Sequence, residues 1–266
     1  MKRIEFIGGP AIGKSTVLKE VIKMRKHNDC WKTAEEARLY LAKTIETKTN
    51  RGKLQRLARI CLKLNLTKFQ NFMASIILNE YKDTILDCLH EKYSDIADIF
   101  LAALFKNDRI NSIDKIRVAV FYFDLLLDNV MLFDYFKLNN LIVYDDGIIH
   151  NNSAFRSIEK SGEVLDNHIR NNTNVIPVGI IYCYMNLERY ITRRKERIIK
   201  GNGIFLDRKL NDFELEDFCR ESLKSAKDKI NVLRLYKVPV LEIDMEESVI
   251  DNAKKAYEFI NGFQYD

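Results

Sequence analysis

The stretch Gly8-Gly9-Pro10-Ala11-Ile12-Gly13-Lys14-Ser15, followed by Thr16, decides how this sequence is interpreted. It matches the pattern G-x-x-x-x-G-K-[ST] at every fixed position, which arises by chance in about one chain in a hundred of this length. Residues 3–7 before it favour a short β-strand, and residues 14–26 after it carry apolar side chains at helical spacing. Strand, glycine-rich loop and helix in this order predict an anion cradle built from backbone N–H groups and the positive end of the helix dipole.

The loop residues have specific expected roles. Lys14 is expected to contact the β- and γ-phosphates of a bound ATP, and the Ser15 hydroxyl to hold Mg²⁺. The residues predicted to bind ATP are Gly8, Gly9, Pro10, Ala11, Ile12, Gly13, Lys14, Ser15 and Thr16. The alternative is an ordinary glycine-rich turn, which the flanking strand and helix disfavour.

The rest of the chain alternates short apolar runs with helical patterns. Residues 141–144, 178–185 and 238–243 are typical of buried parallel strands, and residues 30–33 are a weaker candidate. Helical patterns occur at about 157–170, 187–199, 212–235 and 249–260. The sequence therefore predicts one α/β domain over residues 1–266, with a three-layer α/β/α arrangement, a parallel sheet and a mostly helical insertion at about 39–138.

Composition sets limits on the function. A hydrophobic content of 47% with 30% charged residues is that of a globular protein, and the formal net charge of +5 suits small acidic ligands better than nucleic acid. The five cysteines form no Cys-x-x-Cys pair, which favours reduced thiols over a metal site. The glycine loop begins at Gly8, which leaves no room before it for an apolar signal segment. We therefore expect a cytoplasmic protein.

Two carboxylates follow the apolar run 141–144. Asp145 has the position from which a carboxylate approaches a metal ion, often through water, beside a glycine loop on a neighbouring strand. Asp146 is a candidate for the metal or general-base role. The alternative is turn formation, because Asp-Asp-Gly is favourable turn chemistry. His150, a few residues further on, is a candidate substrate contact, although a lone loop histidine is more often a bystander.

A second acidic group follows the candidate strand 30–33. Glu36, in the sequence Glu35-Glu36-Ala37-Arg38, is a candidate base for an acceptor hydroxyl, and Arg38 is a candidate contact for an acidic acceptor. A helix that starts with acidic residues in its first turn explains the same pattern equally well.

Basic residues concentrate in two segments. Arg193 and Arg197 share one face of the predicted helix 187–199, and glycines beyond it favour a lid at about 187–211 that closes these arginines over the transferred phosphate. A solvated basic helix is the alternative. The second segment, 48–68, is compatible with a membrane surface or an anionic polymer, but an exposed helix packed through its apolar stripe is favoured.

These features together resemble the P-loop nucleoside and nucleotide kinase superfamily, close to its thymidylate kinase and deoxynucleoside kinase branches. Residues 6–16 resemble the first strand and phosphate loop of that family, 35–38 the group after its second strand, 144–146 its third-strand acidic pair, and 189–197 its lid. The likeness covers residues 1–38 and 141 to the C-terminus. The chain departs from the family at Asp146, where those kinases carry an arginine. The resemblance implies a P-loop NTPase fold and kinase activity.

The expected function is therefore ATP- and Mg²⁺-dependent transfer of the γ-phosphate to a hydroxyl or phosphate of a small molecule, with nucleosides and nucleotides among the candidates. The catalytic candidates are Lys14, Glu36, Asp146, Arg193 and Arg197, and the metal candidates are Ser15 and Asp145. The main alternative is an NTP-hydrolysing switch without a small-molecule acceptor. A GTPase is disfavoured because this sequence contains no Asn-Lys-x-Asp guanine motif. A sulfotransferase or a nucleic-acid-end kinase fits less well than a kinase. The sequence predicts neither the acceptor nor an oligomeric state.

Overall fold

A computed structural model describes residues 2–45, 58, 60, 69–108, 110–171, 173–201 and 210–263. The elements in chain order are β1 (Lys2–Ile7), α1 (Lys14–Met24), β2 (Lys32–Thr33), α2 (Ala34–Thr44), α4 (Gln70–Leu78), η2 (Asn79–Tyr81), α5 (Lys82–Phe105), α6 (Ser112–Leu125), the π-helix η3 (Leu126–Met131), α7 (Leu132–Tyr135), β3 (Leu141–Tyr144), α8 (Ile148–Asn151), η4 (Ser153–Arg156), α9 (Ile158–Arg170), β4 (Gly179–Tyr184), α10 (Leu187–Ile199), α11 (Asp212–Leu235), β5 (Val240–Asp244) and α12 (Val249–Asn261). The predicted α/β class is confirmed.

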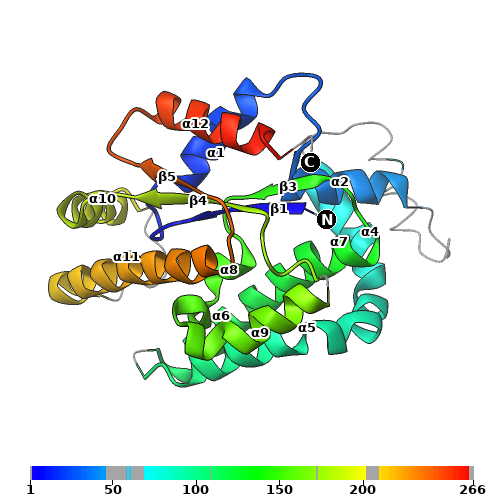
Figure 1. Cartoon of the computed structure of the whole chain (residues 1–266), viewed down its shortest axis with the longest axis horizontal. Helices are drawn as coiled ribbons and strands as arrows, with labels where there is room; N and C mark the ends of the chain where they lie inside the picture. The colour runs from blue at the N-terminus through cyan, green and yellow to red at the C-terminus, as the bar shows by residue number, and fades with distance from the viewer. Residues whose placement is uncertain are drawn as a thin grey trace.

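The five strands form one parallel sheet in the order β2-β3-β1-β4-β5. Strand β1 is central: Glu5 pairs with Tyr144 of β3, and Ile7 pairs with Tyr182 of β4. Helices lie on both sides of the sheet, with α1 and α12 together on one side (Figure 1). From β1 the chain continues to β2 at one edge of the sheet, and from β4 it continues to β5 at the other edge, so its direction across the sheet reverses next to β1. Ligands of open α/β sheets bind beyond the carboxyl ends of strands at such a reversal.

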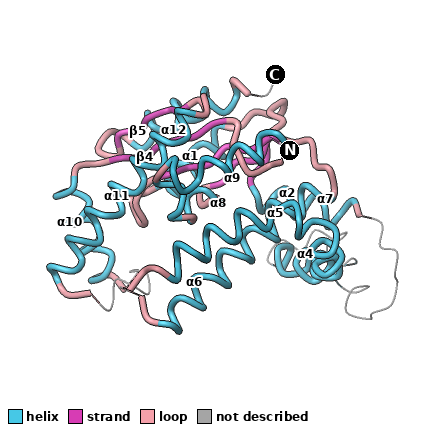
Figure 2. Tube along the Cα trace, turned by 60° about the horizontal axis from the view of Figure 1, so that its bottom comes forward, coloured by secondary structure: helices cyan, strands magenta, loops and turns pink. Residues whose placement is uncertain are grey.

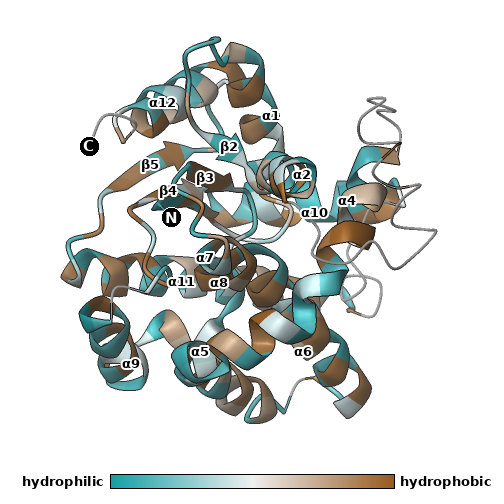
Figure 3. Cartoon of the chain, turned by 90° about the vertical axis from the view of Figure 1, so that its right-hand side faces the viewer, coloured by the Kyte–Doolittle hydropathy of each residue, from teal (hydrophilic) through white to brown (hydrophobic). Residues whose placement is uncertain are grey.

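Strand β1 separates two hydrophobic cores because successive side chains point to opposite faces. Ile4 and Phe6 belong to the core under α1 and α12, whereas Ile7 belongs to the core on the other side. Arg3 and Glu5 share the face of Ile7 and are fully buried as an ion pair, with Arg3 Nε 2.7 Å from a Glu5 carboxylate oxygen. Figure 3 shows hydrophobic residues along β3, and all four residues of this strand are buried. This buried ion pair positions another part of the chain, because Glu5 also accepts hydrogen bonds from backbone N–H groups of α8.

The predicted insertion is helical where it is described. Helices α5 and α6 lie side by side beneath the sheet (Figure 2). Phe100 of α5 stacks on Tyr122 of α6 with ring centroids 3.8 Å apart. The predicted basic segment 48–68 falls almost entirely outside the described residues. Among the described helices, none has both the length and the apolar character needed to cross a membrane.

Candidate functional site

The glycine loop, residues 8–16, turns the chain from the central strand β1 into helix α1. Gly13 has φ 116°, and Ala11 has φ 65°. Gly13 caps α1 without a side-chain hydrogen bond, and the first turn of the helix contains no acidic residue. The N-terminal N–H groups of a helix carry a partial positive charge and need partners. The start of α1 can therefore accept an anion in the way that the sequence pattern predicts.

The loop is held from outside by helix α10. The Tyr190 hydroxyl donates a hydrogen bond to the Pro10 carbonyl oxygen across 2.7 Å, and Arg194 Nη1 donates to the same oxygen across 3.2 Å. Arg194 is fully buried, with its guanidinium over the ring of Phe218, 4.7 Å from the centroid. Sequence reasoning missed this supporting role. Its only signal was the spacing of Tyr190 and Arg194, which are four residues apart on a predicted helix.

Ser15 and Asp145 meet at the carboxyl edge of the sheet. The Ser15 hydroxyl donates to Asp145 Oδ2 across 2.6 Å. In the described part of the chain, no group of three or more His, Cys, Asp or Glu side chains is arranged to hold a metal ion. Mg²⁺ typically binds one or two protein oxygens, completing its octahedron with waters and substrate phosphates. The donor set of Ser15 and Asp145 beside an anion cradle fits that mode of binding.

Lys14 lies under the loop and is almost completely buried. Its ammonium donates to the Gly8 carbonyl oxygen at 3.5 Å and lies 3.2 Å from His150 Nε2. The same imidazole nitrogen is 3.2 Å from Asp146 Oδ1. His150 Nε2 therefore accepts from the lysine in one tautomer and donates to the carboxylate in the other. The structure brings together Lys14 and Asp146, two predicted catalytic residues, through His150, which the sequence offered as a substrate contact but left out of the catalytic candidates.

The backbone of His150 is fixed from two directions. Its N–H group and that of Ile149 donate to Glu5 Oε2 at 3.3 and 3.1 Å, and its carbonyl oxygen accepts a hydrogen bond from the ammonium of Lys229. Glu5 is itself held by Arg3. The buried pair in β1 thus positions the short helix α8 that carries His150.

Burial and mutual repulsion shift the pKa values in this cluster. Burial lowers the pKa of Lys14, although Asp146 opposes that shift. Burial, with help from Lys14 and Lys229, lowers the pKa of His150 well below its usual value. Burial raises the pKa of Asp146 despite the nearby Lys14. His150 is therefore neutral near pH 7 and has a lone pair available for a hydrogen bond.

The predicted lid is described in part. Arg193 of α10 packs against the glycine loop: a methyl group added to Gly13 would lie 3.0 Å from Arg193 Nη2. Arg197 is one turn further along α10. Residues 202–209 of the predicted lid lie outside the described residues.

Glu36 and Arg38 occupy other surroundings. Both carboxylate oxygens of Glu36 accept hydrogen bonds from Arg25, at 2.6 and 2.5 Å, and Glu36 completes a capping box with Thr33 at the start of α2. Burial alone would raise the pKa of Glu36, but the pairing with Arg25 leaves it below its usual range. Arg38 donates hydrogen bonds to the Asp128 carboxylate and to the Ser75 hydroxyl. These contacts match the alternative interpretation of this segment as a helix start, and they keep both residues out of the Lys14 cluster.

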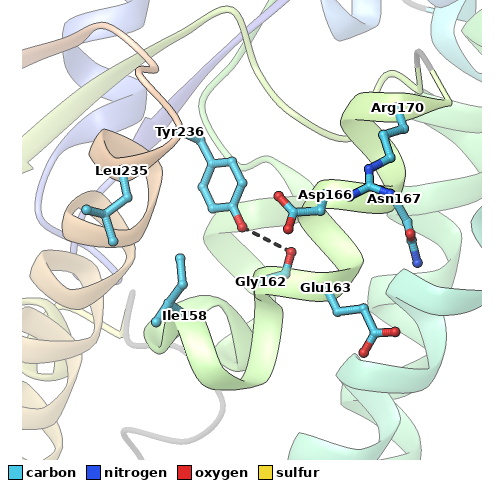
Figure 4. A pocket seen from close by; sticks show the side chains of 8 residues that line it. All are labelled: Ile158, Gly162, Glu163, Asp166, Asn167, Arg170, Leu235 and Tyr236. Carbon is cyan, nitrogen blue, oxygen red and sulfur yellow. Dashed lines mark hydrogen bonds between the residues drawn. The ribbon is translucent and has the colours of Figure 1, made fainter.

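A cleft of about 1110 Å³ opens beside the glycine loop. Gly8, Pro10 and His150 line it, together with residues of α5, η4, α9 and α11. Its size lies at the upper end for small-molecule sites. A smaller hollow of about 620 Å³ lies between α9 and the end of α11, where the Tyr236 hydroxyl donates to the Gly162 carbonyl oxygen at 3.0 Å (Figure 4). No glycine-loop residue lines this smaller hollow, so the larger cleft is the candidate substrate site.

No family model matches the chain, and no curated protein matches its sequence. The functional interpretation therefore depends on the geometry of the glycine loop, Asp145, Asp146 and His150.

Proposed function

We propose that this chain has a P-loop NTPase fold and is an ATP-dependent phosphotransferase that acts on a small molecule. The observation that carries the proposal is the hydrogen bond between Ser15 and Asp145 at the uncapped start of α1, with the buried Lys14 beside it. A hydroxyl and a carboxylate at the edge of an anion cradle are the groups that place a divalent cation next to phosphate oxygens.

Different residues of the loop would bind the phosphates and the metal ion. The N–H groups at the start of α1 and the Lys14 ammonium would contact the β- and γ-phosphate oxygens, so Lys14 would exchange His150 for phosphate. Mg²⁺ bound by Ser15 and, through water, by Asp145 would neutralise charge on those oxygens. Arg193, already against Gly13, is positioned to add positive charge as the transferred group leaves.

The large cleft supplies the place for an acceptor. An acceptor oxygen bound near His150 would attack the γ-phosphorus, the bond from that phosphorus to the ADP oxygen would break, and the acceptor proton would pass to Asp146. His150 Nε2, 3.2 Å from Asp146, would orient the acceptor hydroxyl once Lys14 has turned to the phosphates. A cleft of this size favours a transferase over a nucleotide switch, because a switch needs no acceptor site.

The test is transfer of labelled γ-phosphate from ATP with Mg²⁺ to a panel of nucleosides, nucleotides, sugars and hydroxy acids. Label on one acceptor class, absent in Lys14→Met and retained in Lys23→Met on the exposed face of the same helix, is the expected result. ATP binding with slow phosphate release and no labelled acceptor would instead indicate the NTP-hydrolysing switch.

A further inference from the structure

Lys229 is a buried cation that lines the large cleft. It lies on α11, only 5% exposed, and its ammonium donates to the His150 carbonyl oxygen. An ammonium has three donors and no acceptor. The carbonyl satisfies one donor of Lys229 but supplies no formal negative charge. A buried cation is costly unless it is paired. Glu5 and Asp146 attract Lys229 through their charge, but among the described residues no carboxylate forms an ion pair with it.

The carboxylates nearest to Lys229 are committed elsewhere. Glu5 is paired with Arg3 and accepts two backbone N–H groups, and Asp146 contacts His150 and Asn151. A second cation, Arg156 at the end of η4, lines the same cleft and acts on Lys229 by repulsion. Burial, with repulsion by Arg156 and Lys14, lowers the pKa of Lys229 to about 7, although Glu5 and Asp146 oppose the shift. An anion between the two cations would relieve both costs.

The charge of the cleft changes along α11. Lys229 lies at the end beside the glycine loop, whereas Glu214, Asp217 and Glu221 line the cleft further toward the start of the helix. At 1.5 Å per residue, Glu221 is about 12 Å and Glu214 about 22 Å from Lys229 along the helix. The cation pair and the carboxylates therefore belong to different parts of the cleft. The position next to phosphate transfer is the one suited to an anion.

We infer that the acceptor carries an oxyanion group of its own, a phosphate or a carboxylate, and that Lys229 and Arg156 bind this group beside the position of phosphoryl transfer. This inference rests on the proposed phosphotransferase function, because only a transferase has an acceptor. The anion site itself is defined by the burial of Lys229, its single uncharged partner and its shared cleft with Arg156.

The first experiment compares acceptors in matched pairs: nucleosides with nucleoside monophosphates, sugars with sugar phosphates, and alcohols with hydroxy acids. Labelled γ-phosphate is expected on a charged member at least about tenfold faster than on its uncharged partner, since one charge-assisted hydrogen bond contributes that much or more. Comparing the phosphate and carboxylate pairs identifies which oxyanion is bound. Equal or faster transfer to the uncharged members would overturn the anion site while leaving the transferase in place.

The second experiment measures binding without transfer. The protein is saturated with a non-hydrolysable ATP analogue and Mg²⁺, and binding of the charged panel members is followed by calorimetry. Lys229→Met and Arg156→Gln are each expected to weaken this binding about 10- to 100-fold. Lys229→Arg should retain most of it. Lys227→Met, at an exposed position of the same helix, is the control and should bind like the wild type.

The affinity for the ATP analogue, measured before any acceptor is added, assigns the cations to their ligand. We expect it to change less than about twofold in Arg156→Gln, which leaves the buried cluster intact. A loss of nucleotide affinity as large as the loss of acceptor affinity would assign the cations to the nucleotide and overturn the proposal. Charged members that bind without accepting label would support the anion site and contradict the transferase, whereas failure of both binding and transfer would contradict both.

Discussion

The hydroxyl of Ser15 lies 2.6 Å from the carboxylate of Asp145, although the two residues are 130 positions apart in the chain. The sheet explains this meeting. Strands β1 and β3 are parallel neighbours, so the loop that leaves β1 and the residues that follow β3 reach the same edge. The oxygen pair is therefore a direct consequence of strand order, and it faces the start of a helix that lacks a side-chain cap.

Replacing Asp145 with asparagine tests whether this pair serves a metal. The amide preserves shape and a hydrogen-bond acceptor but removes the negative charge. We expect the Mg²⁺ concentration for half-maximal ATP turnover to rise about 10- to 100-fold, as is usual when a water-mediated metal partner is lost. A titration of turnover against Mg²⁺ measures this. An unchanged Mg²⁺ requirement would assign the Ser15 contact to loop structure alone.

Lys14→Met is expected to remove ATP turnover without unfolding the protein. The side chain is only 9% exposed, and its charge is desolvated, so an apolar side chain of similar length is compatible with the site. Turnover and the thermal midpoint are measured together. The control is Lys23→Met, whose side chain is 69% exposed in an ion pair with Glu20. A folded Lys14→Met protein with wild-type turnover would contradict the proposed role of the loop.

The sequence predicted much of this site because its parts are local. Residues 8–16 form a contiguous pattern, and Asp145 follows a four-residue apolar strand whose end must lie at the sheet edge. Helix α10 was likewise predicted with its observed bounds, Leu187–Ile199. Periodicity and turn chemistry decide such features within a short window.

Other parts depend on contacts that no local pattern encodes. His150 acquires its position from Glu5 and Lys229, which lie 145 and 79 residues away. Glu36 looked like a candidate base, but its partner Arg25 was not recognisable before the end of α1 and the start of α2 were placed in contact. The cleft is likewise lined by residues of α5, η4, α9 and α11, which lie far apart in the sequence and which no short window places together.

Adjacent arginines on α10 are expected to behave in opposite ways. Arg193→Met should lower kcat about 100-fold or more while changing the free energy of unfolding by less than about 0.5 kcal/mol, because Arg193 is partly exposed and faces the loop. Arg194→Met should cost about 2 kcal/mol of stability, since it loses charged hydrogen bonds to Pro10 and Tyr190. Denaturant unfolding and steady-state kinetics on both variants separate these effects. Equal losses of kcat and stability in the two variants would contradict the distinction.

The stability of the ligand-free protein should rise with pH between about 7 and 9. Lys229 has a pKa of about 7 in the folded state and 10.5 as a reference, so the unfolded chain holds more protons in this window. Stability then increases with pH, by at most about 1.4 kcal/mol per pH unit for this group. The lowered pKa of Lys14 acts in the same direction.

Urea denaturation at several pH values measures this dependence. Lys229→Met should flatten it, whereas the exposed Lys227→Met should leave it unchanged. A wild-type stability that falls from pH 7 to 9, or a Lys229→Met slope equal to that of the wild type, would contradict the burial of a poorly compensated amine.

Gly147 is expected to be the least replaceable residue of the loop after β3. An added methyl group would overlap the carboxylate of Glu5, which is fixed by Arg3 and by the N–H groups of α8. Gly147→Ala should therefore cost about 3 kcal/mol of stability and displace His150. Gly162→Ala is the matched control: its methyl group would meet Ile158 at 3.4 Å within α9, and alanine should stabilise the helix by about 0.5 to 1 kcal/mol. Denaturant unfolding of the two variants gives the comparison, and a Gly147→Ala protein as stable as the wild type would show that Glu5 does not hold α8 in place.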